Sequence, residues 1–417
     1  MRLLASALFA LSAIPAQAQV DDSDALLLAD KAPTLQERAS DLTASVEGSV
    51  GSIDQRYGLP REHTQRTSLD MQYDKTLSKN WRVLLSDRLD LNSSDQFKHQ
   101  STVNTLREAY LSWQASDNHI VDGGRINARN GVAIGYNPTD YFRDGALRSI
   151  SSITPASLKK NRLGSVMLRG QQLWNNGSFT ALYSPKISTQ SSDASFSADL
   201  GATNNRNRWL LSLSQKISND INPQWMIYGE EHHSPQVGTN LTYLVTDAAV
   251  SYIEWSGGRS KSLSSQLFNT MNDEAFRSRL STGVTYTTDN KISYTLEYDY
   301  NGAGMDKNEW NALRKGAISA YTRYRTWAQN SQDPATKQSV FFYSAWQDAM
   351  MNHLDVSGMV RYNLQDNSRM SWLEARHHWD HADLALQWQR NSGSAGSVFG
   401  ALPQTRTMQI VGTYFFH

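Results

Sequence analysis

Charged side chains concentrated in residues 119–170 are the part of this sequence best suited to chemistry. The segment holds eight basic residues against three acidic ones, a net charge of +5. Arginine and lysine at the narrow point of a pore select anions, and guanidinium groups pair well with carboxylates and phosphates. The candidates for such a constriction are Arg107, Glu108, Arg125, Arg129, Asp140, Arg143 and Arg148.

The basic segment also admits a second interpretation, a solvated surface loop that binds lipopolysaccharide phosphates. Asn137-Pro138 predicts a turn, and Asp140 could cap the residues that follow. A second long segment, 301–339, is also basic and has helical character over residues 308–327. Both interpretations remain open.

Histidine pairs at 232–233 and 377–378, the latter near Asp380 and His381, raise the question of catalysis. Adjacent residues on a strand face opposite sides, so at most one histidine of each pair could join a common site. The spacing offers no set of three or four converging metal ligands, and no serine lies in a nucleophile motif. We therefore predict no enzyme, no metal and no cofactor, with a barrel hydrolase as the less favoured alternative.

The composition narrows the class of protein. The 417 residues carry 40 basic and 40 acidic side chains, which gives no net attraction to nucleic acid. Cysteine is absent, which excludes disulfides and thiolate sites. Mean hydropathy is −0.55, yet there are 12 Trp and 18 Tyr residues. A polar chain rich in aromatic residues is typical of a barrel wall between lipid and water.

The final stretch, 405–417, shows the element that would position the charges. Met408, Ile410, Tyr414 and Phe416 share one face, and threonine and glutamine dominate the other. Such alternation predicts a strand between two environments. An aromatic end near the terminus is typical of the closing strand of an outer-membrane barrel, where it serves the barrel-assembly machinery as an insertion signal. An ordinary half-buried strand is the alternative.

The same alternation recurs from Leu42 onward and predicts an all-β, transmembrane, antiparallel up-and-down barrel of about eighteen strands, with sixteen as the alternative. At 292–300, Glu297 and Asp299 share the face that must be wet. Short periplasmic turns and long extracellular loops are expected to alternate. The predicted strands are 42–50, 65–73, 81–91, 102–113, 119–127, 163–174, 178–184, 209–217, 225–231, 248–255, 262–268, 280–287, 292–300, 340–347, 354–364, 370–379, 384–389 and the terminal strand.

This order of strands assigns short turns to one end of the barrel, among them 257–261. Tryptophan is expected at the strand ends beside those turns, because an indole prefers the membrane interface. The residues concerned are Trp81, Trp113, Trp174, Trp225, Trp255 and Trp346.

The N-terminal residues predict the cellular compartment of the protein. A basic start, an apolar run over residues 3–14 and Ala16-Gln17-Ala18 form a secretory signal peptide, residues 1–18. Residues 19–41 are interpreted as a periplasmic leader, which could instead plug the lumen. The transmembrane barrel is then 42–417.

Residues 124–148 read GRINARNGVAIGYNPTDYFRDGALR. This segment, with 107–113 and 361–368, resembles the pattern of porin-like outer-membrane proteins related to the alginate-export group of Gram-negative bacteria. The resemblance implies an eighteen-stranded channel and no particular substrate.

The sequence thus favours an outer-membrane channel, porin-like or exporting, for hydrophilic solutes that are anionic or saccharide in character. The expected partners are outer-membrane lipid, lipopolysaccharide, the barrel-assembly machinery, a small hydrophilic solute and a periplasmic protein at the leader, and not nucleic acid. A structural or adhesive surface barrel without transport is the alternative.

Overall fold

The computed structural model describes residues 41–94, 101–218, 220–269 and 272–416. The predicted signal peptide, residues 1–18, lies outside these residues, as does the predicted leader except for Asp41. The described residues cover nearly all of the predicted barrel, residues 42–417.

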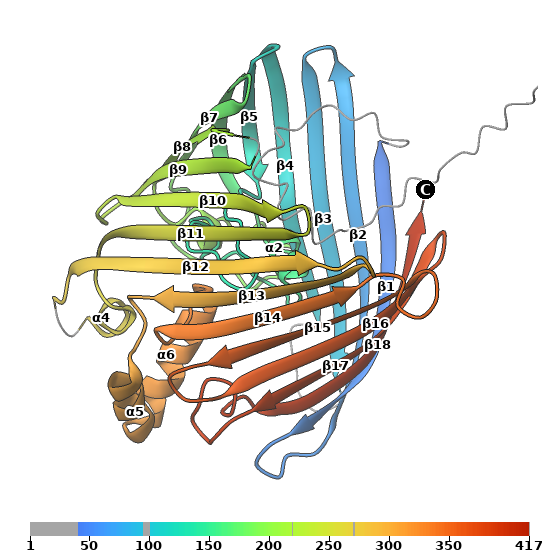
Figure 1. Ribbon diagram of the computed structural model, residues 1–417, viewed down its shortest axis with the longest axis vertical. Coiled ribbons are helices and arrows are strands. Elements are labelled where there is room, and N and C mark those ends of the chain that lie inside the picture. Colours follow the sequence, from blue (N-terminus) through green and yellow to red (C-terminus); the bar gives the residue numbers. More distant parts are fainter. Residues whose placement is uncertain (1–40, 95–100, 219, 270–271, 417) are drawn as a thin grey trace, which may run out of the picture.

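Eighteen antiparallel strands form one sheet that closes on itself (Figure 1). Each strand pairs with its neighbours along the chain, and β1 pairs with β18, with Val50 opposite Ile410. The predicted fold class, an eighteen-stranded up-and-down barrel, is confirmed. The strands are β1 Leu42–Gln55, β2 Glu62–Ser78, β3 Trp81–Ser94, β4 Thr102–Ser116, β5 His119–Ile126, β6 Ser165–Trp174, β7 Gly177–Ser184, β8 Arg208–Gln215, β9 Ile221–Glu230, β10 Gln236–Thr246, β11 Ala249–Ser260, β12 Ala275–Thr287, β13 Ile292–Asn301, β14 Gln338–Trp346, β15 Leu354–Asn363, β16 Arg369–His378, β17 Ala382–Ser392 and β18 Gln404–Phe416.

The two faces of the barrel wall differ as the alternation predicts. On β18, Ile410 is 48% exposed and faces outward, whereas the adjacent Val411 is 3% exposed and faces the interior. On β13, Leu296 is exposed on the outer face and Glu297 is buried inside. Apolar side chains outside and polar ones inside are what a wall between lipid and water requires.

The count of eighteen strands is right, but two elements differ from the prediction. Residues 262–268, predicted as a strand, form helix α4 (Leu263–Phe268) after the N-cap Ser262, whose hydroxyl accepts the Ser265 N–H at 3.2 Å. Strand β10 was missed, although Val237, Leu241 and Tyr243 do alternate along it.

These two errors shift the predicted turns between the ninth and twelfth strands. The short turn expected at 257–261 is wrong: residues 257–260 belong to β11, and the short turn there is 247–248. Trp255 is accordingly not beside a short turn, because its ring stacks on Phe276 near the other end of β12, at a centroid distance of 6.4 Å. Trp81 and Trp113 do lie together at the short-turn end, with centroids 6.0 Å apart.

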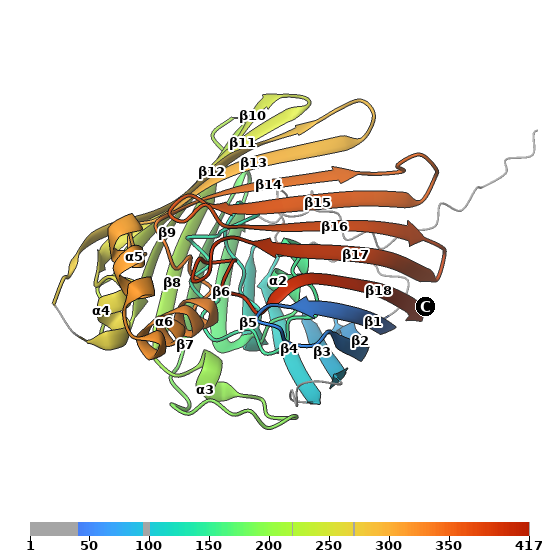
Figure 2. The same cartoon turned by 90° about the horizontal axis from the view of Figure 1, so that it is seen from below.

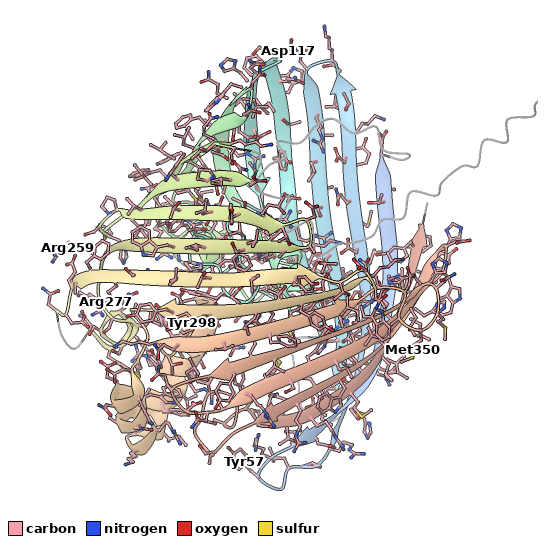
Figure 3. The ribbon with its side chains drawn as sticks, viewed as in Figure 1. Tyr57, Asp117, Arg259, Arg277, Tyr298 and Met350 are labelled. Carbon is pink, nitrogen blue, oxygen red and sulfur yellow. The ribbon has the colours of Figure 1, made fainter. Side chains whose placement is uncertain are left out.

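The barrel has one end with short connections and one with long connections. Figure 3 marks Asp117 and Met350 in short turns, and Tyr57, Arg259 and Arg277 toward the opposite end. The short turns are 79–80, 117–118, 175–176, 216–220, 247–248, 288–291, 347–353 and 379–381. The longest connections at the opposite end are 127–164, 185–207 and 302–337.

The helices lie in the long connections. Leu263, Trp310 and Tyr324, from α4, α5 and α6, pack together in one apolar cluster. Figure 2 places these three helices at the end of the barrel opposite to the C-terminus. In the described ranges, no helix combines the length and apolar character that crossing a membrane requires. The other helix bounds are α2 Pro155–Lys160, α3 Leu200–Thr203, α5 Lys307–Lys315 and α6 Ile318–Asn330.

Candidate functional site

The connection between β5 and β6, residues 127–164, lies inside the barrel; we call it the inner loop. Its course is fixed by Glu254, a fully buried residue of β11 that faces the interior. The Glu254 carboxylate accepts hydrogen bonds from the backbone N–H groups of Val132 at 2.9 Å and Thr139 at 2.8 Å. A buried carboxylate is stable only when such donors replace water. The inner loop therefore crosses from β5 to the wall at β11.

Glu297 on β13 holds the next part of the inner loop. Its carboxylate accepts hydrogen bonds from three consecutive N–H groups, those of Ile134, Gly135 and Tyr136, at 2.9, 2.9 and 3.0 Å. A Cβ atom at Gly135 would lie 2.7 Å from the Phe341 ring and 2.8 Å from a Glu297 oxygen. Only glycine allows the backbone to approach this closely.

Apolar packing fixes the rest of the inner loop. Phe142 and Ala128 join a buried cluster with Met167, Leu210 and Tyr228 on the inner faces of β6, β8 and β9. The interior that faces β5–β15 is thus filled by protein, and we call it the closed half.

A second long connection, residues 302–337, is bound to the inner loop by an ion pair. Arg143 of the inner loop donates to Asp333, and the Tyr136 hydroxyl donates to the same carboxylate at 2.9 Å. Burial alone would raise the pKa of Asp333, but the neighbouring Arg143 and Arg279 guanidinium groups lower it below its ordinary value. Asp333 therefore stays ionised in this contact.

Arg107 and Glu108 point into the same space, although they are adjacent on β4. The register between β3 and β4 shifts at this point, which is a β-bulge that places one extra residue on β4. Arg107 is 2% exposed and binds both oxygens of Asp70, at 2.6 and 2.7 Å. Its charge is neutralised by the wall, so it acts as a structural group.

Arg125 and Arg148 bind backbone carbonyls rather than the lumen. Arg125 is 3% exposed and donates to the Ala198 carbonyl. Arg148 donates to the carbonyls of Asn104 at 3.0 Å and Ser197 at 2.6 Å. These contacts attach the connection 185–207 to the long-loop end of β4, beyond the last residue that β5 pairs with it.

Asp140 is neutralised within the inner loop. It is 3% exposed and accepts two hydrogen bonds from Arg162, at 2.7 and 3.1 Å. The side chains predicted to form one constriction are therefore not brought together as a charged ring. Most of them hold loops in place.

Arg129 is the exception among the predicted arginines. Its side chain is exposed, and no hydrogen bond or ion pair from the described residues engages its guanidinium. Although its side chain is accessible from the lumen, the surrounding protein excludes part of the solvent and lowers the pKa of Arg129, as do the charges of Arg162 and Arg107, while Glu108 opposes this effect. Lys160, which was not among the candidates, lies in the same region, with its side chain 47% exposed and Nζ 4.0 Å from Asp70.

The interior that faces β16–β18 and β1–β4, which we call the open half, contains a cavity of about 1000 Å³. It is bounded by these strands and by residues 148–153 of the inner loop. Ion pairs follow the same wall: Arg66 and Arg88 bind Glu47 at 2.6 and 2.8 Å. Sequence analysis missed this cavity, because its polar residues come from both ends of the chain.

No group of three or more His, Cys, Asp and Glu side chains in the described residues could hold a metal ion. One of the histidines named in the sequence analysis, His378, is bound between Asp383 at 2.9 Å and Asp355 at 3.4 Å, at the short-turn end of β16. The predicted absence of a cofactor remains a prediction.

The fold is similar to those of solved outer-membrane proteins. OccAB1 of Acinetobacter baumannii superposes with a TM-score of 0.55 and 13% identity, covering 90% of this chain and 97% of that one. A BenF-like porin from Pseudomonas fluorescens Pf-5 gives 0.55 and 9%, covering 90% and 98%, and the outer membrane protein opdK from Pseudomonas aeruginosa gives 0.54 and 8%, covering 90% and 99%. No protein-family model and no curated protein sequence matches the chain. At these identities the similarity establishes the fold of a porin barrel.

Proposed function

We propose that this protein is an outer-membrane channel through which small hydrophilic solutes diffuse along the open half of the barrel. The observation that carries the proposal is the unequal filling of the interior. The inner loop fills the closed half, whereas a polar cavity of about 1000 Å³ remains beside β16–β18 and β1–β4. The porin fold of its structural neighbours supports the same conclusion.

Within this channel, we assign a preference for anions to Arg129 and Lys160. Both side chains are exposed inside the barrel, and neither is bound as tightly as Arg107 is by Asp70. Burial lowers the pKa of Lys160, and Arg107, Arg88 and Arg129 lower it further despite the opposing charge of Asp70. A passing carboxylate or phosphate would relieve this repulsion between cations.

The remaining parts of the proposal concern the membrane. The signal peptide would deliver the chain to the periplasm, and the terminal strand would engage the barrel-assembly machinery. Lipid would then surround the outer face, with lipopolysaccharide around the long connections and a periplasmic protein at residues 19–41. An export direction, which the likeness to the alginate-export group would favour, also remains a proposal.

The test is single-channel recording of the refolded protein in planar bilayers. We expect ion conductance with anion selectivity, and we expect Arg129→Ala with Lys160→Ala to lower the anion-to-cation permeability ratio several-fold. The matched control is Lys307→Ala with Lys315→Ala, two exposed cations of α5 outside the barrel interior. An unchanged ratio in the first variant would refute the role of Arg129 and Lys160.

A surface barrel without transport is the second candidate, since α4–α6 and the connection 393–403 cover part of the long-loop end. It predicts no conductance and no solute-driven swelling of liposomes. A hydrolase is the less favoured candidate. Turnover of phospholipid or peptide substrates would restore it.

A further inference from the structure

The cavity of the open half presents uncharged side chains to its interior. Thr64, Asn92, Gln404, Thr407 and Gln409 line it from β2, β3 and β18. Amides and hydroxyls both donate and accept hydrogen bonds. At about 1000 Å³, the cavity lies at the upper end of the range of roughly 300–1,000 Å³ usual for ligand pockets.

The charged groups of the cavity lining are occupied by the protein itself. Arg148 is held by backbone carbonyls, and Arg66 binds Glu47 at 2.6 Å and the Ser151 carbonyl at 2.8 Å. Glu62 accepts hydrogen bonds from Gln55 and Ser94. A charged solute would find the hydrogen-bonding groups of these residues already engaged by the protein.

A chain of three side chains fixes the orientation of the amides. The Glu374 carboxylate, which binds Arg376 at 2.9 Å, can only accept hydrogen bonds. Gln387 must therefore donate its N–H to Glu374 and accept from Gln409 through its carbonyl oxygen. This makes Gln409 donate to Gln387 and leaves its carbonyl oxygen without a hydrogen bond from the described residues, on a side chain that lines the cavity.

A fixed carbonyl oxygen favours solutes that carry hydrogen-bond donors. An anionic oxygen is repelled by it, whereas a sugar hydroxyl donates to it and can accept from Thr407 or Asn92 nearby. Because the orientation is imposed by Glu374, the site is organised before a solute arrives, which reduces the entropy lost on binding.

We propose that this cavity is a binding site for neutral, hydroxyl-rich solutes, specifically short oligosaccharides, on the route of the proposed channel. The inference rests on the channel function for its role in transport, and binding itself does not require conduction. This neutral site lies on the long-loop side of Arg129 and Lys160. The proposed channel would therefore contain a neutral solute site followed by a cationic one.

The experiment uses the full-length protein with maltotriose and an acidic trisaccharide of similar size that contains uronate groups. In planar bilayers we expect maltotriose to interrupt the ion current in a concentration-dependent manner. Gln409→Leu should weaken this block about tenfold, because it removes one buried hydrogen bond to the sugar. Thr407→Val, which preserves shape, provides a second variant and should weaken the block several-fold.

Two controls separate the cavity from the rest of the lumen. Gln171→Leu changes an inward-facing glutamine on β6, away from the cavity, and should leave the block unchanged. Arg129→Ala should alter ion selectivity and leave the maltotriose block intact. If Arg129→Ala abolishes the block, or if the acidic trisaccharide binds more tightly than maltotriose, the neutral site is overturned.

Calorimetric titration in detergent makes the inference independent of transport. Maltotriose binding that is weakened by Gln409→Leu supports the site even if the bilayers show no conductance, a result that would refute the channel alone. Conductance without block and without calorimetric binding would leave the channel standing and overturn the oligosaccharide site.

Discussion

The closed half and the open half of the barrel interior differ in the groups that bind their inward-facing carboxylates. In the closed half, the inward-facing carboxylates Glu254 and Glu297 are bound by backbone N–H groups of the inner loop. In the open half, Glu47 and Asp70 are bound by arginines of the wall itself, such as Arg66 and Arg107. A carboxylate satisfied by a loop fixes that loop in the lumen. One satisfied by a neighbouring strand leaves the lumen free, and this difference decides where a solute can pass.

The largest effect is expected from Glu254→Ala. It removes the acceptor for the backbone N–H groups of Val132, Ala133 and Thr139, which are buried. Leaving these donors without partners costs on the order of 3–5 kcal/mol, so the inner loop should leave the wall. We expect a severalfold larger and noisier single-channel conductance, and new proteolytic cleavage within residues 131–139.

The matched variant in the open half is Glu47→Ala. It removes one carboxylate partner from Arg66 and from Arg88, while Arg66 keeps its hydrogen bond to the Ser151 carbonyl of the inner loop and Arg88 keeps Asp90 at 2.9 Å. Selectivity should shift toward anions while cleavage of the inner loop stays as in the unmodified protein. If both variants release the loop equally, the distinction between the two halves is wrong.

Two glycines, one in the inner loop and one on β1, test the same comparison with a smaller expected effect. Gly135→Ala should destabilise the folded barrel by about 1–3 kcal/mol, because its Cβ would meet Phe341 and Glu297 at 2.7 and 2.8 Å. Gly48→Ala on β1 has no atom within 4 Å of its Cβ and should have little effect. The temperature at which the folded form is lost in gel electrophoresis measures both, and equal temperatures would contradict the packing of the inner loop.

The smallest expected effect is the pH dependence of the contact between Arg143 and Asp333. The pKa of Asp333 is lowered from its ordinary 3.8, so the stabilising contribution of this contact is complete above that value and is lost only as pH falls through the lower, folded value. The contact between Arg143 and Asp333 should thus contribute no change in conductance between pH 7 and pH 4. In Arg143→Met, burial is no longer opposed by this guanidinium, and the change should begin at higher pH. A titration of conductance that is identical in both proteins would contradict this.

Alternation along the chain was sufficient to predict the barrel, because an inside-outside pattern with period two is a local property. It failed at residues 262–268, where a short apolar run fits a strand or a helix and the Ser262 cap decides. It also failed at β10, whose outward Val237, Leu241 and Tyr243 alternate but were not recognised.

The candidate site was less predictable, because pairing depends on register and on distant residues. Arg107 meets Asp70, and Arg143 meets Asp333, partners separated by 37 and 190 positions. Counting the charged residues of a segment does not show that most of them are neutralised by partners distant in the sequence. Of the five predicted arginines only Arg129 is exposed, and Lys160, which was not among the predicted site residues, is exposed in the same region.

The distance along the chain between the inner loop and its anchors has a consequence for biogenesis. Residues 132–139 stand between β5 and β6, but the carboxylates that hold them belong to β11 and β13, with 122 positions between Val132 and Glu254 and 163 between Ile134 and Glu297. The lumen cannot acquire its filling until those later strands are in place. Docking of the inner loop therefore depends on contacts of high sequence separation, which cost more loop-closure entropy than the pairing of neighbouring strands.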